Sequence, residues 1–259
     1  MSKKDKAEVI TAVADKLPKT VSAVDSVLST VVGVFDLLLT PFQIAKIYKD
    51  AKLEEIKNNI IEKSKNIPEE DLKESADLSV VGPALEAMKY TIMNDDLNEL
   101  FENLLVSSLD KKKNVFPGFV DIIKQLNSDE AKVLKYLAQH GETYPVISLR
   151  CEKKDGNGGV DIVNNFTNIG YGVCEKPLLT TTYLVDLARF GLIDFAQGKY
   201  LIDDKVYEPL INHSDIKKID NRVLNLKGFN DYHVVKSYFK ITEYGKEFIS
   251  ACVSVKDNK

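Results

Sequence analysis

The sequence predicts a mainly helical α+β fold in two domains, one helical over residues 1–126 and one mixed over 127–259. A chain of 259 residues suits two domains, because domains typically hold about 100–150 residues. In the first half, apolar residues recur at three- and four-residue steps, which is the period of an amphipathic helix. The second half alternates such segments with short apolar runs bounded by glycine, which is typical of strands and turns.

A hydrophobic helical hairpin is predicted near residues 20–60. Its first helix has an apolar face that includes Val21 and Phe35. It ends at Pro41, where the preference of proline for a first helical turn predicts a second helix that continues to Ile60. We interpret this hairpin as part of a buried core.

Membrane contact through residues 21–48 is the alternative interpretation. The window from Ser26 to Ile44 carries one charge, Asp36, and has about the length that a bilayer core requires, ~20 residues. Asp36 and the break at Pro41 oppose insertion, because charges and interrupted helices are costly in lipid. The buried hairpin is therefore favoured, and a peripheral position at the inner membrane face stays open.

Further helices are predicted in the first domain. Ile67-Pro-Glu-Glu places a proline and carboxylates in a first turn, which is a helix start signal. Other helices are predicted to follow Gly82-Pro83, to begin at Asp96 in a D-x-x-E capping pattern, and to follow the turn at 116–119. Together these segments predict a helical domain.

An acidic cluster lies at the start of one of these helices. Asp95, Asp96, Glu99 and Glu102 place several carboxylates on one helical side, which is how acid/base pairs or hard-cation sites can be built. Carboxylates in a first turn also stabilise a helix by facing its positive dipole end. We favour this second role and predict no metal site.

The second half has the element order of a winged helix. A helix over 128–140 precedes a β-hairpin at 145–165, whose turn is the glycine-rich segment 153–159. A helix over 178–190 follows, then short strands and a final helix. The predicted strands span 192–195, 200–202 and 236–241, and the helix spans 242–252. We therefore predict a winged-helix-like domain with a hairpin insertion.

Nucleic-acid binding is the alternative function that this domain raises. In a DNA reader the helix 178–190 would enter the major groove, yet it offers three threonines (180–182), Asp186 and only Arg189. The net charge is −4, with 17 basic and 21 acidic residues in 1–126 and 18 of each in 127–259. Since affinity for phosphate depends on basic side chains, this charge balance disfavours binding of nucleic acid.

No catalytic, cofactor-binding or metal-binding residue is predicted, and no cofactor is expected. The glycines fit neither a phosphate-binding loop nor a dinucleotide motif. Cys151, Cys174 and Cys252 form no zinc motif and indicate a reduced, cytoplasmic setting. A spatial Cys–His pair that uses Cys151 or Cys174 with one of the histidines (His140, His213, His233) stays open as a minor alternative.

Several segments resemble the abortive infection alpha family. They are residues 80–91 (VVGPALEAMKYT), 99–110 (ELFENLLVSSLD), 115–134 (VFPGFVDIIKQLNSDEAKVL), 187–193 (LARFGLI) and 241–249 (ITEYGKEFI). The resemblance runs from about Ile67 almost to the end, and its central block is the most specific. It implies a bacterial or prophage-encoded protein of phage defence and implies no catalytic residues. The family pattern often has His where this chain has Phe116, so the resemblance implies a packing role at that turn.

These observations together predict a non-enzymatic phage-defence protein that acts through protein–protein or membrane contact. A protein partner is expected, whereas membrane contact through 21–48 and a winged-helix nucleic-acid regulator are the alternatives. The oligomeric state, the trigger and the target do not follow from the sequence.

Overall fold

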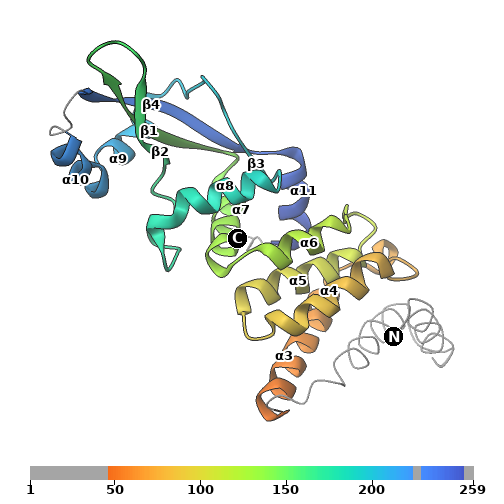
Figure 1. The fold of residues 1–259 in the computed structure, drawn as a ribbon. Coiled ribbons are helices and arrows are strands. Elements are labelled where there is room, and N and C mark those ends of the chain that lie inside the picture. The colour runs from red at the N-terminus through yellow and green to blue at the C-terminus, as the bar shows by residue number, and fades with distance from the viewer. Residues whose placement is uncertain (1–45, 224–228, 254–259) are drawn as a thin grey trace, which may run out of the picture. The chain divides into compact units, whose positions relative to one another are not determined.

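A computed structural model of the chain describes residues 46–223 and 229–253 (Figure 1). The chain divides into two compact units. Unit 1 contains described residues 46–128 and 247–253, and unit 2 contains the described part of 129–246. The sequence assigned all of 127–259 to one domain, whereas in the structure the last residues of the C-terminal helix group with the first unit.

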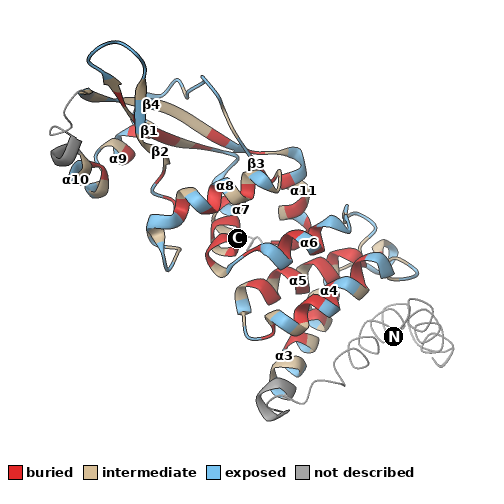
Figure 2. Cartoon of the chain, in the orientation of Figure 1, coloured by how far each residue is buried: buried red, intermediate tan, exposed pale blue. Residues whose placement is uncertain are grey.

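Unit 1 is built from helices. They are α3 (Lys46–Ser64), the 3-10 turn η1 (Glu69–Asp71), α4 (Leu78–Thr91), α5 (Asp95–Ser108), α6 (Gly118–Gln125) and the end of α11 (Glu243–Cys252). The core lies around α5, where Leu100, Phe101, Leu104 and Leu105 have essentially no exposed surface (Figure 2). Their spacing of three and four residues is the reason that one helical face is buried. Phe119 of α6 contacts Phe248 of α11 edge to face, with ring centroids 5.1 Å apart.

The predicted hairpin near 20–60 falls mostly outside the described residues, as does almost all of the membrane-contact segment 21–48. Its second helix is represented by α3, in which Ile56 and Ile60 are buried. Within the described part of the chain, every helix is too short or too polar to cross a bilayer.

Three local predictions in unit 1 were wrong. The start signal at Ile67 yields only η1, because the chain beyond it is held extended by a bridge between Leu72 and Asp110. Helix α4 begins before Gly82-Pro83 and passes through this pair, since the Asp77 side chain caps it at Ser79 N. The cap of α5 is Asn94, whose side-chain oxygen accepts a hydrogen bond from Leu97 N at 3.2 Å.

The acidic cluster joins two helices of unit 1. Lys52 of α3 pairs with Asp95 at 2.7 Å, and Lys63 pairs with the buried Glu102 at 2.7 Å. Asn59 donates a second hydrogen bond to Glu102 at 3.1 Å. Two of the four carboxylates therefore attach α3 to α5, and the described residues contain no group of three side chains arranged to hold a metal ion.

Unit 2 contains an antiparallel sheet with the strand order β2-β1-β4-β3, which completes a mixed α+β fold. The strands are β1 (Thr143–Lys153), β2 (Gly159–Phe166), β3 (Ile193–Phe195) and β4 (Phe229–Ile241). The helices are α7 (Ser128–His140), η2 (Pro177–Leu179), α8 (Thr180–Arg189), η3 (Asp204–Tyr207), α9 (Glu208–Ile211) and α10 (Ser214–Val223), with the start of α11.

The central pair of the sheet is β1 with β4, in register from Thr143 opposite Lys240 to Cys151 opposite Tyr232, after which the register shifts before Lys153 pairs with Phe229. Strand β2 pairs with β1 around the glycine-rich turn, in which Gly156 and Gly158 have φ of 75° and 83°. Other residues rarely adopt this left-handed conformation, so these glycines permit the turn. The strand predicted at 200–202 is absent, and Ile202 there is almost fully exposed.

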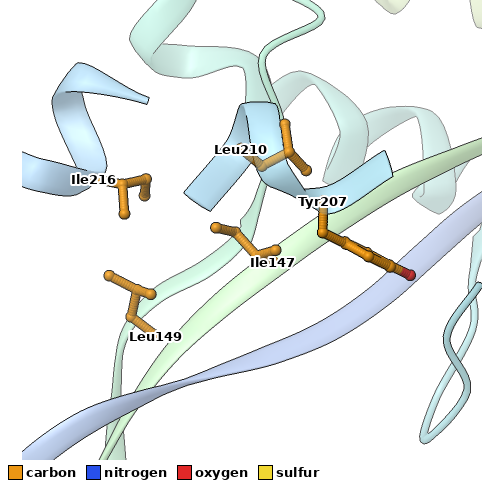
Figure 3. Packing of buried hydrophobic residues seen from close by; sticks show 5 residues of the cluster. All are labelled: Ile147, Leu149, Tyr207, Leu210 and Ile216. Carbon is orange, nitrogen blue, oxygen red and sulfur yellow. The ribbon is translucent and has the colours of Figure 1, made fainter. Parts of the chain in front are cut away.

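A helical insertion, defined here as residues 204–223, separates β3 from β4. Its buried side chains Tyr207, Leu210 and Ile216 pack on Ile147 and Leu149 of β1 (Figure 3). This apolar contact fixes α10 on one face of the sheet, near the segment that leads into α8.

Candidate functional site

Helix α8 and the turn before it expose a group of apolar side chains to solvent. Leu178 is 76% exposed, Leu179 43% and Val185 54%, and Thr182 lies exposed between them. We call these four residues the α8 face. The opposite side of the helix is buried through Tyr183, Leu184 and Leu187. Adjacent apolar side chains that stay exposed in a folded unit often mark a contact site.

Most of the side chains that were expected to contact nucleic acid already make hydrogen bonds or ion pairs within the protein. Thr180 is buried and donates to Pro177 O at 2.6 Å, and Thr181 donates to Asn165 O at 3.4 Å. The Arg189 guanidinium pairs with Asp186 at 2.7 Å and lies 4.2 Å from the centre of the Phe190 ring. Of the predicted contacts, only Thr182 and the locally paired Arg189 are exposed, which disfavours DNA readout.

The start of this helical segment is held in place by one buried carboxylate. Asp129 of α7 accepts hydrogen bonds from Glu175 N at 2.8 Å, Lys176 N at 3.0 Å and Tyr183 Oη at 3.0 Å. Burial opposes ionisation of this carboxyl, but the two backbone hydrogen bonds and the Tyr183 hydroxyl outweigh it and lower the pKa of Asp129. The ionised side chain therefore anchors α8 and the preceding turn to α7.

A small pocket adjoins the α8 face. Its volume is about 130 Å³, and it is open to solvent on one side and lined by β2, by the turn before α8 and by α10. Its lining residues are Val163, Phe166, Thr167, Tyr171, Pro177, Leu178, Thr180, Thr181, Asp215, Ile216 and Ile219. The surroundings are mainly apolar, with hydroxyl groups and one carboxylate. Apolar walls with a few polar groups are also found in ligand-binding sites, although such sites usually measure about 300 Å³ or more.

The carboxylate of this pocket belongs to Asp215. It accepts hydrogen bonds from Tyr171 Oη and from Lys218 Nζ, the latter at 2.8 Å. These bonds lower the pKa of Asp215, and burial together with the carboxylate raises the pKa of Tyr171 to about 12. At neutral pH the pocket therefore holds an ionised carboxylate beside a neutral phenol.

Aromatic rings surround this polar pair. The His213 ring lies 4.3 Å from that of Tyr171 and 5.2 Å from that of Phe166, measured between centroids. The His213 Nδ1 atom accepts a hydrogen bond from Asp215 N at 3.3 Å. His213 therefore supports the wall of the pocket.

The structure also places the other cysteines and histidines, among them Cys151 and Cys174, which were considered for a Cys–His pair. Cys151 and Cys252 are buried, and burial raises the pKa of Cys252. His140 stacks on Tyr136 at the end of α7, whereas His233 is exposed on β4. Cys174 contacts Asp129 O at 3.8 Å through Sγ.

We expect Cys174 to be a poor nucleophile. Burial, with a contribution from Asp129, raises the pKa of its thiol to about 11, so that the thiolate fraction near pH 8 falls about a hundredfold below that of a thiol with a pKa of 9.0. Its alkylation by iodoacetamide, followed by mass spectrometry, should be slower by a similar factor than that of a cysteine introduced at exposed Asp155. Equal alkylation rates at the two cysteines would show that Cys174 is reactive and would favour a thiol-based reaction.

The sequence did not indicate the pocket. Tyr171 and Asp215 are 44 residues apart, and only the packing of the insertion on β1 brings them together. The sequence feature nearest to the pocket is Gly-Tyr-Gly at 170–172, followed by a run of leucines and threonines. This pattern is not specific for a binding site.

Comparison with known proteins identifies the family. The model of the family described as abortive infection alpha matches residues 48–252, which is most of the chain. The chain belongs to the abortive infection alpha family. This family suggests phage defence of the abortive-infection type, and its match includes α8, the pocket and all described strands. The resemblance noted from about Ile67 almost to the end of the chain is thus confirmed. Phe116 contacts Phe119 edge to face with ring centroids 5.3 Å apart, but its side chain is 44% exposed, so it is packed on one side only.

No curated protein sequence matches this family member. A solved structure of an uncharacterized protein from the hydrocarbon-degrading marine bacterium Alcanivorax borkumensis SK2 is similar, with 17% sequence identity and a TM-score of 0.34. The similarity covers 52% of this chain and 92% of that chain.

Proposed function

We propose that the chain is a non-enzymatic phage-defence protein whose unit 2 docks a partner protein through the α8 face. The observation that carries the proposal is the exposure of Leu178, Leu179 and Val185 on one helical segment. Exposed apolar side chains gain free energy when another protein covers them, because water is removed from their surface.

We further propose that unit 2 is a winged-helix relative. The order α7, β1–β2, α8, β3, β4 and α11 supports this proposal, since α8 stands in the place of a recognition helix and β3 pairs with β4 as wing strands would. The helical insertion occupies the connection between these strands. A recognition helix with an apolar exposed face and an internally paired arginine suits a protein surface better than phosphate.

Phage challenge of expressing cells tests the docking role. We expect Val185→Asp, alone or with Leu178→Asp, to reduce protection at least about tenfold in plating efficiency, because a charge placed in an apolar contact costs several kcal/mol on desolvation. Ile202→Asp is the matched control, since Ile202 is 97% exposed in the same unit but lies outside the α8 face. Val185 does not line the pocket, so its effect is specific to docking.

Three results would contradict this function. Full protection by the Val185→Asp variant, with the fold retained in circular dichroism, would exclude the α8 face as the docking site. A salt-sensitive mobility shift of DNA by the purified chain would favour the nucleic-acid regulator instead. In the same phage challenge, early loss of membrane potential in dye-loaded cells would favour membrane contact through 21–48.

A further inference from the structure

The pocket beside α8 has the dimensions of a single ring. An apolar cavity of about 150 Å³ in a protein interior can hold benzene, and this pocket measures about 130 Å³. Phe166, Ile216 and Ile219 supply apolar walls, and Leu178 stands at its exposed side. Its size and walls therefore favour a compact apolar group over an extended ligand.

The polar side chains of the pocket determine which charge a bound ligand should carry. An ionised carboxylate has about four acceptor positions on its two oxygens. For Asp215, Tyr171 Oη occupies one on Oδ2 and Lys218 Nζ occupies one on Oδ1. The carboxylate can therefore accept further donors, and it repels an anion.

The ion pair with Lys218 is one that a ligand can replace. The Lys218 side chain is 71% exposed, and pairs of this kind contribute little free energy in water. An ammonium group that entered the pocket would form the same charge-assisted bond in a less hydrated place. The rings of Tyr171 and Phe166, both of which line the pocket, also attract a cation placed against their faces.

We propose that this pocket binds a small primary amine that carries one apolar ring. The ammonium group donates to Asp215, and the ring lies between Phe166 and Ile216. Leu178 belongs to both the pocket and the α8 face, but the charge preference argued here comes from Asp215, which is not part of that face.

Nuclear magnetic resonance titration of the full chain with phenethylamine tests the proposal. A ligand of this size is expected to bind with a Kd of about 1 mM. The expected result is saturable shifts of the amides in 163–181 and 214–219. Phenethyl alcohol, which has the same ring without the charge, should bind about tenfold more weakly, and phenylacetate more weakly still.

Two variants make the test specific. Asp215→Asn should remove the preference for the amine over the alcohol, whereas Asp155→Asn, at the exposed hairpin turn, should leave it unchanged. The absence of saturable shifts up to about ten times the expected Kd would overturn the proposal, as would equal affinity for phenylacetate or an unchanged preference in Asp215→Asn.

Discussion

Replacing Gly245 with alanine is expected to lower the free energy of unfolding of unit 2 by about 3 kcal/mol. Gly245 lies in the first turns of α11, and a Cβ atom at this position would stand 2.0 Å from the carbonyl oxygen of Leu192. That carbonyl cannot move freely, because it accepts a hydrogen bond from Thr242 N at 3.0 Å. The helix or β3 must therefore shift, and the packing at this corner is lost.

Hydrogen exchange of the amides in β1 and β4 measures this change, since exchange of the central strands reports opening of the whole unit. Glu243→Ala in the same helix is the control, because its side chain is 91% exposed, and we expect a change within about 0.5 kcal/mol. Equal exchange in the two variants would show that α11 does not lie this close to Leu192.

Replacing Asp129 with alanine is expected to cost about 3 kcal/mol in the same measurement, because three donors lose a buried acceptor. The effect should depend on pH. The pKa of Asp129 is lower in the folded state than its ordinary value of 3.8, so its contribution to stability is complete above that value and is lost as the pH falls through the folded value. The difference between wild type and variant should therefore become smaller as the pH falls below 3.8.

Asp186→Ala provides the comparison for Asp129→Ala. Asp186 pairs only at the surface with Arg189 of the same helix, and we expect its replacement to change stability by less than about 1 kcal/mol. A similar cost for both aspartates, or a cost for Asp129→Ala that persists unchanged at pH 3, would contradict the anchoring role.

The sequence predicted those elements whose signals are local. The final helix is one example. Thr242, at the predicted start of this helix, caps it by accepting a hydrogen bond from Gly245 N on its Oγ1 atom at 2.9 Å. The hairpin strands and α8 are others, since glycine turns bound their apolar runs. The start signal at Ile67 failed because the pairing of Leu72 with Asp110, which is remote in sequence, overrode it.

The candidate site was less predictable than the fold. Sequence patterns indicated α8 and its scarcity of basic side chains, but not that Thr180 would be buried or that Val185 would be exposed. The helical insertion was missed because its buried residues, such as Tyr207 and Ile216, find their partners on β1 and not within the segment. A pocket made by such remote contacts leaves no local signal.

The course of α11 has a consequence for synthesis of the chain. The helix begins in unit 2, where Gly245 lies against Leu192, and ends in unit 1, where Ser107 Oγ donates to Ala251 O at 2.9 Å. Domains usually fold in order as they leave the ribosome, from the N-terminus onward. Here neither unit can complete its packing until the last turns of the chain have been made. A chain that ended before α11 would therefore lack packing contacts in both units, since each unit contains a part of that helix.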